Sequence, residues 1–300
     1  MKDALTDLVA GAVDYAGLFP PAALDMDAAV RAYASYLQDG ARFMLGRFVV
    51  PVVRLREFED ARAGIAPAGD TTRGEPWRLS VLTGPDTTAD LALASRFNDR
   101  HAEAGDAVID AVELKVVSRP EIAAAVSRMP RELTPYFEIP VADDPADLVA
   151  EIRRGGAYAK VRTGGVTADA FPQPAQLARF LVRCRDAKVG FKLTAGLHHP
   201  LRASYPLTYA AGAPRADMFG FLNLYVAAAL AWADTPEPVV VAALESRSAH
   251  DFHFTDDALG FRGHWVSVDE VRDARTRFVR SFGSCSFREP ADELASLSFS

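Results

Sequence analysis

The sequence predicts a closed (β/α)₈ barrel, the TIM-barrel fold. Short apolar runs alternate with amphipathic stretches along the whole chain, which is typical of βα units that build a parallel sheet. Eight apolar runs within 300 residues favour a closed barrel over an open sheet. The chain shows no internal repeat and no low-complexity run. We therefore expect residues 1–300 to form a single domain.

Each expected strand is an apolar run bounded by turn-forming or polar residues. The eight runs are Ala12–Phe19, Phe43–Val52, Trp77–Leu82, Val108–Val117, Pro135–Val141, Ala157–Arg162, Gly190–Thr194 and Phe278–Ser284. Between them, the stretches long enough for crossover helices are Asp27–Leu37, Ala89–Ala104, Pro120–Arg128, Pro145–Arg154 and Pro174–Arg185. The glycines and threonines of Gly64–Gly74 predict a loop.

One segment departs from this order. Residues 198–277 are far too long for a simple connection between strands seven and eight, so we expect an insertion with its own structure. Residues 219–230 predict a strand that runs into a helix, and residues 252–265 alternate around a turn as a hairpin does. An insertion after strand seven emerges on the face where barrel enzymes build active sites. The segment is therefore a candidate lid, with a dimerisation element as the alternative.

Composition restricts the class of ligand. The net charge of −7 and the isoelectric point near 5.4 argue against nucleic acid and against an anionic membrane surface, because both need a basic face. A small molecule is the expected partner, and a homo-oligomer is left open. Two cysteines and an N-terminus without the pattern of a signal peptide fit the reducing cytoplasm. No apolar stretch reaches the roughly 18 residues of a membrane span.

Two lysines stand where a buried strand residue is expected. They are Lys160 in Ala157–Gly165 and Lys192 in Val189–Gly196, each followed by a turn of small residues. An ammonium group without water or a partner costs several kcal/mol unless it loses its proton, and a second positive charge nearby lowers the pKa of a lysine. A neutral amine is what imine (Schiff-base) chemistry needs. The alternative is that both lysines lie at strand ends and point into water.

Several segments resemble deoxyribose-phosphate aldolase, a class I aldolase on a (β/α)₈ barrel. Lys160-Val161-Arg162-Thr163-Gly164-Gly165 and Lys192-Leu193-Thr194-Ala195-Gly196 match the family's sixth and seventh strands in order and spacing. Three shorter segments also resemble it, namely Val13–Pro21 at the start, Ile109–Val112 on the fourth strand and Arg280–Ser286 at the end. The likeness covers most of the barrel but is weak between these segments.

The resemblance implies roles for three residues. Lys160 would form the imine, Lys192 would be the charged neighbour that keeps it deprotonated, and Asp110 would relay a proton through water. Chemistry also requires such a relay, because a carbinolamine must lose water before the imine forms. Asp110 and Glu113 point to opposite faces of a regular strand, so only one of them can face the interior, and Asp110 is chosen on the resemblance.

The chain also departs from the family pattern. Arg162 lies two residues after Lys160 and so points the same way, where it could bind an anionic group or pair with Glu138. Deoxyribose 5-phosphate itself is therefore not the expected substrate. Gly283 and Ser284 end the last strand, where barrel enzymes often bind phosphate through backbone N–H groups. Cys285 has no His or Asp partner by sequence, and Cys184 is expected in the core.

The first functional hypothesis is a carbon–carbon lyase that uses a lysine imine and no cofactor or metal. Its expected catalytic residues are Lys160, Lys192 and Asp110, and its expected substrate-binding residues are Arg162, Glu138, Thr194, His198, Gly283 and Ser284. A metal-assisted hydrolase or isomerase built on His198 and His199 is the second hypothesis, although the histidine spacing matches no standard ligand pattern. A barrel without catalytic activity is the third, since fold alone does not decide function.

Overall fold

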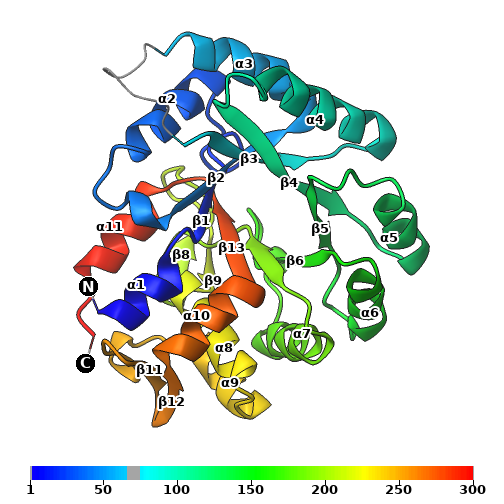
Figure 1. Ribbon diagram of the computed structural model, residues 1–300. Coiled ribbons are helices and arrows are strands. Elements are labelled where there is room, and N and C mark those ends of the chain that lie inside the picture. Colours follow the sequence, from blue (N-terminus) through cyan, green and yellow to red (C-terminus); the bar gives the residue numbers. More distant parts are fainter. Residues whose placement is uncertain (1, 66–74, 300) are drawn as a thin grey trace.

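The computed structural model describes residues 2–65 and 75–299 and shows the predicted α/β barrel. Eight parallel strands close in the order β1-β13-β7-β6-β5-β4-β3-β2, with helices around them (Figure 1). The insertion expected between the seventh and eighth barrel strands is also present and carries two small sheets. The predicted loop Gly64–Gly74 lies, from residue 66 onward, outside the described residues.

The barrel strands coincide or overlap with the predicted apolar runs. They are β1 (Val13–Tyr15), β2 (Leu45–Pro51), β3 (Trp77–Leu82), β4 (Ala107–Lys115), β5 (Thr134–Glu138), β6 (Tyr158–Arg162), β7 (Phe191–Thr194) and β13 (Val279–Ser284). The helices before and between the first seven strands are α1 (Asp3–Val9), α2 (Met26–Tyr36), α3 (Leu55–Ala63), α4 (Thr87–His101), α5 (Arg119–Val126), α6 (Ala146–Arg154) and α7 (Pro174–Ala187). Apolar side chains between this ring and the strands form the core.

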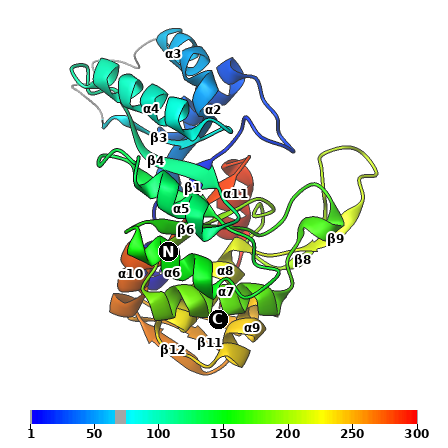
Figure 2. The same ribbon diagram turned by 90° about the vertical axis from the view of Figure 1, so that its right-hand side faces the viewer.

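The insertion divides into two parts with different neighbours. Its first part is an antiparallel pair, β8 (Ala203–Pro206) and β9 (Arg215–Met218), which projects from the body of the protein in Figure 2. Its second part contains α8 (Phe221–Trp232), α9 (Glu237–Glu245), and the sheet of β10 (Phe252–Phe254), β11 (Ala258–Phe261) and β12 (His264–Ser267). This three-stranded sheet replaces the simple hairpin predicted there and contacts α1, α8 and α10.

Helix α8 is apolar on every side, and the structure explains why. Its neighbours are α7, α9, α10 (Val268–Arg277), β12 and β13, so Phe221 to Ala231 are all buried. A helix that is hydrophobic all round is stable in water only under such complete cover. The chain ends with α11 (Arg288–Ser296). Across residues 2–65 and 75–299, every helix is too short or too polar to cross a membrane.

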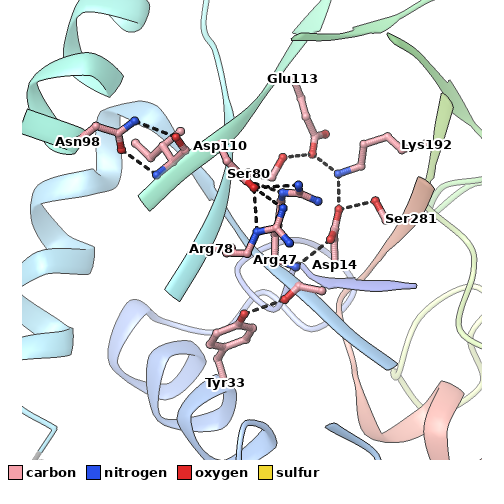
Figure 3. A network of polar contacts seen from close by, with 12 residues as sticks. Asp14, Tyr33, Arg47, Arg78, Ser80, Asn98, Asp110, Glu113, Lys192 and Ser281 are labelled. Atoms are coloured by element: carbon pink, nitrogen blue, oxygen red, sulfur yellow. Dashed lines mark hydrogen bonds and ion pairs between the residues drawn. The ribbon is translucent and has the colours of Figure 1, made fainter. Parts of the chain in front are cut away.

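Strand β4 contains an irregularity that positions the site. The register between β3 and β4 skips Asp110, so two residues of β4 take the place of one residue of β3. Such a β-bulge leaves backbone groups outside the ladder and shifts the alternation of side chains. The amide of Asn98 on α4 binds both the N–H and the C=O of Ile109, each at 2.8 Å (Figure 3). Beyond the bulge, Glu113 points into the barrel.

Candidate active site

Lys160 and Lys192 lie directly opposite each other on the adjacent strands β6 and β7. Both side chains point into the barrel, where they are buried, with exposed fractions of 4% and 1%. Inward-facing residues at matching positions of neighbouring strands are only about 5 Å apart at the backbone. The structure thus brings together the two lysines that the sequence singled out, and it places neither of them in open solvent.

Glu113 joins the two lysines from across the barrel. Its Oε1 lies 2.5 Å from Nζ of Lys192, and its Oε2 lies 2.7 Å from Nζ of Lys160. The hydroxyl of Ser80 on β3 also donates to Oε1 at 2.7 Å (Figure 3). Burial alone would raise the pKa of Glu113, but the two ammonium groups outweigh it and hold that pKa well below its usual range. Glu113 is therefore ionised at neutral pH.

Asp14 on β1 completes the partners of Lys192. Its Oδ2 accepts from Nζ of Lys192 at 2.6 Å and from the hydroxyl of Ser281 at 2.7 Å, and its Oδ1 accepts from the backbone N–H of Arg47 at 2.8 Å. Burial lowers the pKa of Lys192, but the attraction of Asp14 and Glu113 raises it overall. Lys192 is consequently a fixed cation, held by carboxylates from two other strands.

Lys160 has a second carboxylate partner, which is nearer to solvent. Oε2 of Glu138 on β5 lies 2.8 Å from Nζ of Lys160, and Oε1 of Glu138 lies 3.9 Å from the guanidinium of Arg162. The side chain of Glu138 is 11% exposed, whereas that of Glu113 is 3% exposed. Glu138 therefore contacts the buried amine of Lys160 while its own carboxylate is partly exposed.

Asp110, expected as the proton relay, has different neighbours. It lies in the bulge near the start of β4, and its carboxylate binds the guanidinium groups of Arg47 and Arg78 (Figure 3). Those two cations lower the pKa of Asp110 although burial opposes them. The structure brings Glu113, rather than Asp110, to the lysines. Asp110 and Glu113 contact Arg78 and Ser80, which share one face of β3, so the bulge leaves both carboxylates on the same face. Asp110 lies nearer the start of β4, where it reaches the arginines and not the lysines.

A cavity of about 570 Å³ opens above the lysines at the C-terminal ends of the barrel strands. It is lined by most of the residues expected to bind substrate, namely Glu138, Arg162, Thr194, His198 and Gly283, and also by Glu113, Lys115, Lys160 and Lys192. The expected contact Ser284 is buried, and its hydroxyl accepts from the N–H of Ser286 at 3.4 Å. Within the insertion, the cavity-lining residues fall between His198 and Met218.

Two histidines after β7 form one wall of this cavity. Nδ1 of His198 lies 3.2 Å from Oε2 of Glu289, and Nδ1 of His199 lies 2.8 Å from Oε1 of Glu293. The ring of His199 also stacks on Tyr205 at a centroid distance of 3.6 Å. Both acids come from α11, far from the histidines in sequence, so no local motif could have paired them. Each histidine is thereby held in place by a carboxylate.

The two histidines considered for a metal centre, His198 and His199, are paired with the carboxylates of α11. In residues 2–65 and 75–299, no group of three or more His, Cys, Asp or Glu side chains is arranged to hold a metal ion. His198 and His199 have ring centroids 6.3 Å apart and turn toward different carboxylates, Glu289 and Glu293. The arrangement seen in this part of the chain is two His–Glu pairs.

Comparison with known proteins adds no family to this description. Neither a protein-family model, nor a curated protein, nor a solved structure matches the chain. The barrel fold is common to enzymes of many kinds, so the fold by itself does not name a reaction. A function has to be argued from the buried lysines, their carboxylates and the cavity above them.

Proposed function

We propose that this protein is a carbon–carbon lyase that works through a Schiff base, as class I aldolases do. The observation that carries the proposal is the position of Lys160 at the floor of the cavity, between Glu113 and Glu138 and opposite Lys192. Buried lysines within a cavity are rare, and a lysine with an adjacent proton acceptor is suited to attack a carbonyl carbon. The substrate class is a small carbonyl compound with an anionic group.

Lys160 is the better nucleophile of the two lysines. Lys192 is held by Asp14 and Glu113, and their attraction raises its pKa, so it keeps its proton. Lys160 contacts Glu138, which lines the cavity and can take a proton from the ammonium group across 2.8 Å. The neutral amine then adds to the carbonyl carbon: its lone pair forms the new C–N bond, the carbon–oxygen π pair moves to the oxygen, and a proton passes from the nitrogen to that oxygen.

Loss of water from the resulting carbinolamine needs an acid at the same place. Glu138, once it has accepted the proton of Lys160, can return it to the departing hydroxyl. The iminium that remains accepts the electron pair of the neighbouring carbon–carbon bond and becomes an enamine, while Glu138, again a carboxylate, takes the proton of the β-hydroxyl group and the second carbonyl fragment leaves. Lys192 and Glu113 keep the surrounding charge fixed while this happens, which is the preorganised electrostatic environment that catalysis favours.

Cations at the upper part of the cavity suit an anionic substrate. Arg162 and Lys115 line the cavity and are exposed, and His198 also lines it. A guanidinium binds a carboxylate or phosphate with two parallel hydrogen bonds, so Arg162 is the proposed contact for that group. The backbone beside Gly283 offers a second place for it, because a glycine leaves the main chain open to close approach.

Reductive trapping tests the proposal. The protein is incubated with a panel of oxo-acids, hydroxyaldehydes and sugar phosphates, reduced with borohydride, and mapped by peptide mass spectrometry. We expect an adduct on Lys160 that Lys160→Arg abolishes. The matched control is Lys188→Arg, because Lys188 lies over the ring of Trp232 outside the cavity lining. Adducts spread equally over exposed lysines such as Lys2 and Lys188, with none enriched at Lys160, would refute the mechanism.

A further inference from the structure

A second group of reactive side chains lines the cavity beyond the lysine network. Sγ of Cys285 lies 3.8 Å from Nδ1 of His198 and 3.6 Å from the hydroxyl of Tyr209. Oε2 of Glu289 lies 3.2 Å from the same Nδ1 and 2.8 Å from the same hydroxyl. All four side chains line the cavity. Cys285 follows β13, His198 follows β7, Tyr209 lies in the β8–β9 hairpin and Glu289 lies on α11. The fold therefore brings together four residues that belong to no common sequence motif.

We propose that Cys285 is a second nucleophile of the cavity, that His198 is its proton partner, and that its ligand is a small aldehyde, which it binds as a reversible hemithioacetal. The lysine chemistry proposed above neither requires this site nor is required by it. The geometry places a thiol and a carboxylate against the same nitrogen, Nδ1 of His198, so the N–H at that position is shared between Sγ of Cys285 and Oε2 of Glu289. Tyr209 provides a hydroxyl on the other side of the sulfur.

The charge on His198 supports the assignment. Burial lowers the pKa of His198, but its contacts with Cys285 and Glu289 outweigh burial and raise that pKa to about 9. The imidazole is therefore protonated at neutral pH. An imidazolium beside the sulfur can give its proton to the oxygen of an aldehyde whose carbon the sulfur attacks. Glu289 is the group that holds this imidazolium in place, at 3.2 Å.

The proposed step balances without any co-reactant. The sulfur electron pair of Cys285 forms a C–S bond to the aldehyde carbon. The carbon–oxygen π pair moves to the oxygen, which takes the proton of His198. The product is a neutral hemithioacetal beside a neutral imidazole, and the reverse step releases the aldehyde. Because no oxidant is consumed and no group leaves, a free aldehyde is a sufficient ligand.

The chain supplies its own control thiol. Cys285 is 5% exposed but opens into the cavity, so a small reagent can reach it. Cys184 on α7 is 0% exposed, and burial raises its pKa well above the usual value. The two cysteines are the only ones in the sequence, so each labelled peptide reports on one environment.

The test measures alkylation by iodoacetamide at pH 6 with peptide mapping of both cysteines. We expect Cys285 to react about 10-fold faster than in His198→Gln, because the glutamine keeps a polar side chain but carries no positive charge. Cys184 stays unlabelled in both proteins. Glu289→Gln gives a smaller decrease and serves in place of His198→Gln if that variant does not fold, which circular dichroism decides. Labelling of Cys285 in the wild-type protein at or below the rate of free glutathione at pH 6 would overturn the proposal.

Protection by an aldehyde identifies the ligand class. Excess glycolaldehyde should slow the alkylation of Cys285 several-fold, and acetate, which has a similar size but no aldehyde group, should not. The same experiment in Lys160→Arg separates the two nucleophiles, because an imine on Lys160 could also shield the cavity. Protection that survives in Lys160→Arg supports a bond to Cys285. Protection that vanishes there means that the aldehyde binds Lys160 alone, and the thiol assignment is then wrong even though the lyase proposal stands.

Discussion

Glu113 and Lys192 form an ion pair of 2.5 Å between two side chains that are both buried. The two residues come from β4 and β7, which are not neighbours in the barrel, so the pair spans its interior. A buried pair adds little to stability over an apolar pair of the same size, but removing one partner leaves an unpaired charge at a large cost. A buried ion pair that adds little to stability, placed beneath a cavity, is a reason to look for a function there.

Removal of Lys192 should destabilise the protein strongly. In Lys192→Met, Asp14 and Glu113 lose their shared cation, and the free energy of unfolding should fall by about 3–5 kcal/mol, the range for breaking a buried pair. Urea unfolding followed by circular dichroism measures this. Lys115→Met is the matched control, because Lys115 lines the same cavity but is exposed. Equal losses of unfolding free energy in the two variants would show that the buried ion pairs of Lys192 add no more to stability than an exposed lysine does.

The stability of the protein should depend on pH through Glu113. Its pKa in the folded state lies well below the ordinary value of 4.5, so the unfolded chain binds a proton there more readily than the folded protein does. The contribution of this carboxylate is thus fully present above about pH 4.5 and is lost as the pH falls below that value. Urea titrations between pH 3 and 7 should show that, as the pH falls, the free energy of unfolding decreases more steeply in the wild type than in Glu113→Gln. Parallel curves would contradict the assignment.

Glu138 should be the proton relay for Lys160. Glu138→Gln removes the proton acceptor but keeps the shape of the side chain, so the rate of imine trapping on Lys160 should fall by about 100-fold, the lower range for loss of an acid/base group. Glu138→Asp keeps the carboxylate and should retain part of the rate. The readout is the initial rate of adduct formation under borohydride, at saturating carbonyl compound. Equal rates in the wild type and in Glu138→Gln would assign the relay to another group.

Asp110 should be structural. Asp110→Asn leaves Arg47 and Arg78 without their common carboxylate, and the unfolding free energy should decrease by about 1 kcal/mol, as expected for a partly exposed ion pair. The rate of imine trapping on Lys160 should stay unchanged, since Asp110 lies in the bulge at the other end of β4. A loss of trapping comparable with that of Glu138→Gln, in a folded variant, would restore the catalytic role that the resemblance assigned to Asp110.

His198 should titrate far above an ordinary histidine. Its pKa is raised from 6.5 to about 9, so the stability that depends on the charged imidazole is fully present below about pH 6.5 and is lost as the pH rises through about 9. An NMR titration of the imidazole signals should show one histidine with this high midpoint. Glu289→Gln should lower that midpoint, because it removes one of the two groups that raise the pKa of His198. A midpoint near 6.5 in the wild type would rule out the charged pair.

Much of the fold could be predicted because it follows from the periodicity and length of the apolar runs in the sequence. The apolar runs marked all eight barrel strands, and the small-residue turns after Lys160 and Lys192 marked the ends of β6 and β7. Two lysines at matching positions of consecutive strands must be close in a parallel barrel, so their proximity followed from the fold. These conclusions needed only local sequence and the regular geometry of strands.

The partners of those lysines could not be predicted in the same way. The alternation rule allowed only one of Asp110 and Glu113 to face the interior, but the bulge at Asp110, held by Asn98 from α4, breaks that alternation. Asp110 binds Arg78 and Glu113 binds Ser80, two residues on the same face of β3, so both carboxylates lie on that face at different heights. A bulge depends on contacts between elements and leaves no clear trace in composition. The same holds for Cys285, whose neighbours His198 and Tyr209 lie on two other segments of the chain.

The exposed cations of Lys115 and Arg162 and the buried carboxylates below them give the cavity a polarity along the barrel axis. The floor holds Asp14, Glu113 and Glu138 against two ammonium groups, a formal excess of one negative charge, whereas Lys115 and Arg162 bring two positive charges to the lining nearer solvent. A substrate with an anionic end and a neutral carbonyl end is repelled at its anionic end by the floor and attracted by the entrance. The cavity therefore orients such a molecule before any bond forms, with the carbonyl group toward Lys160.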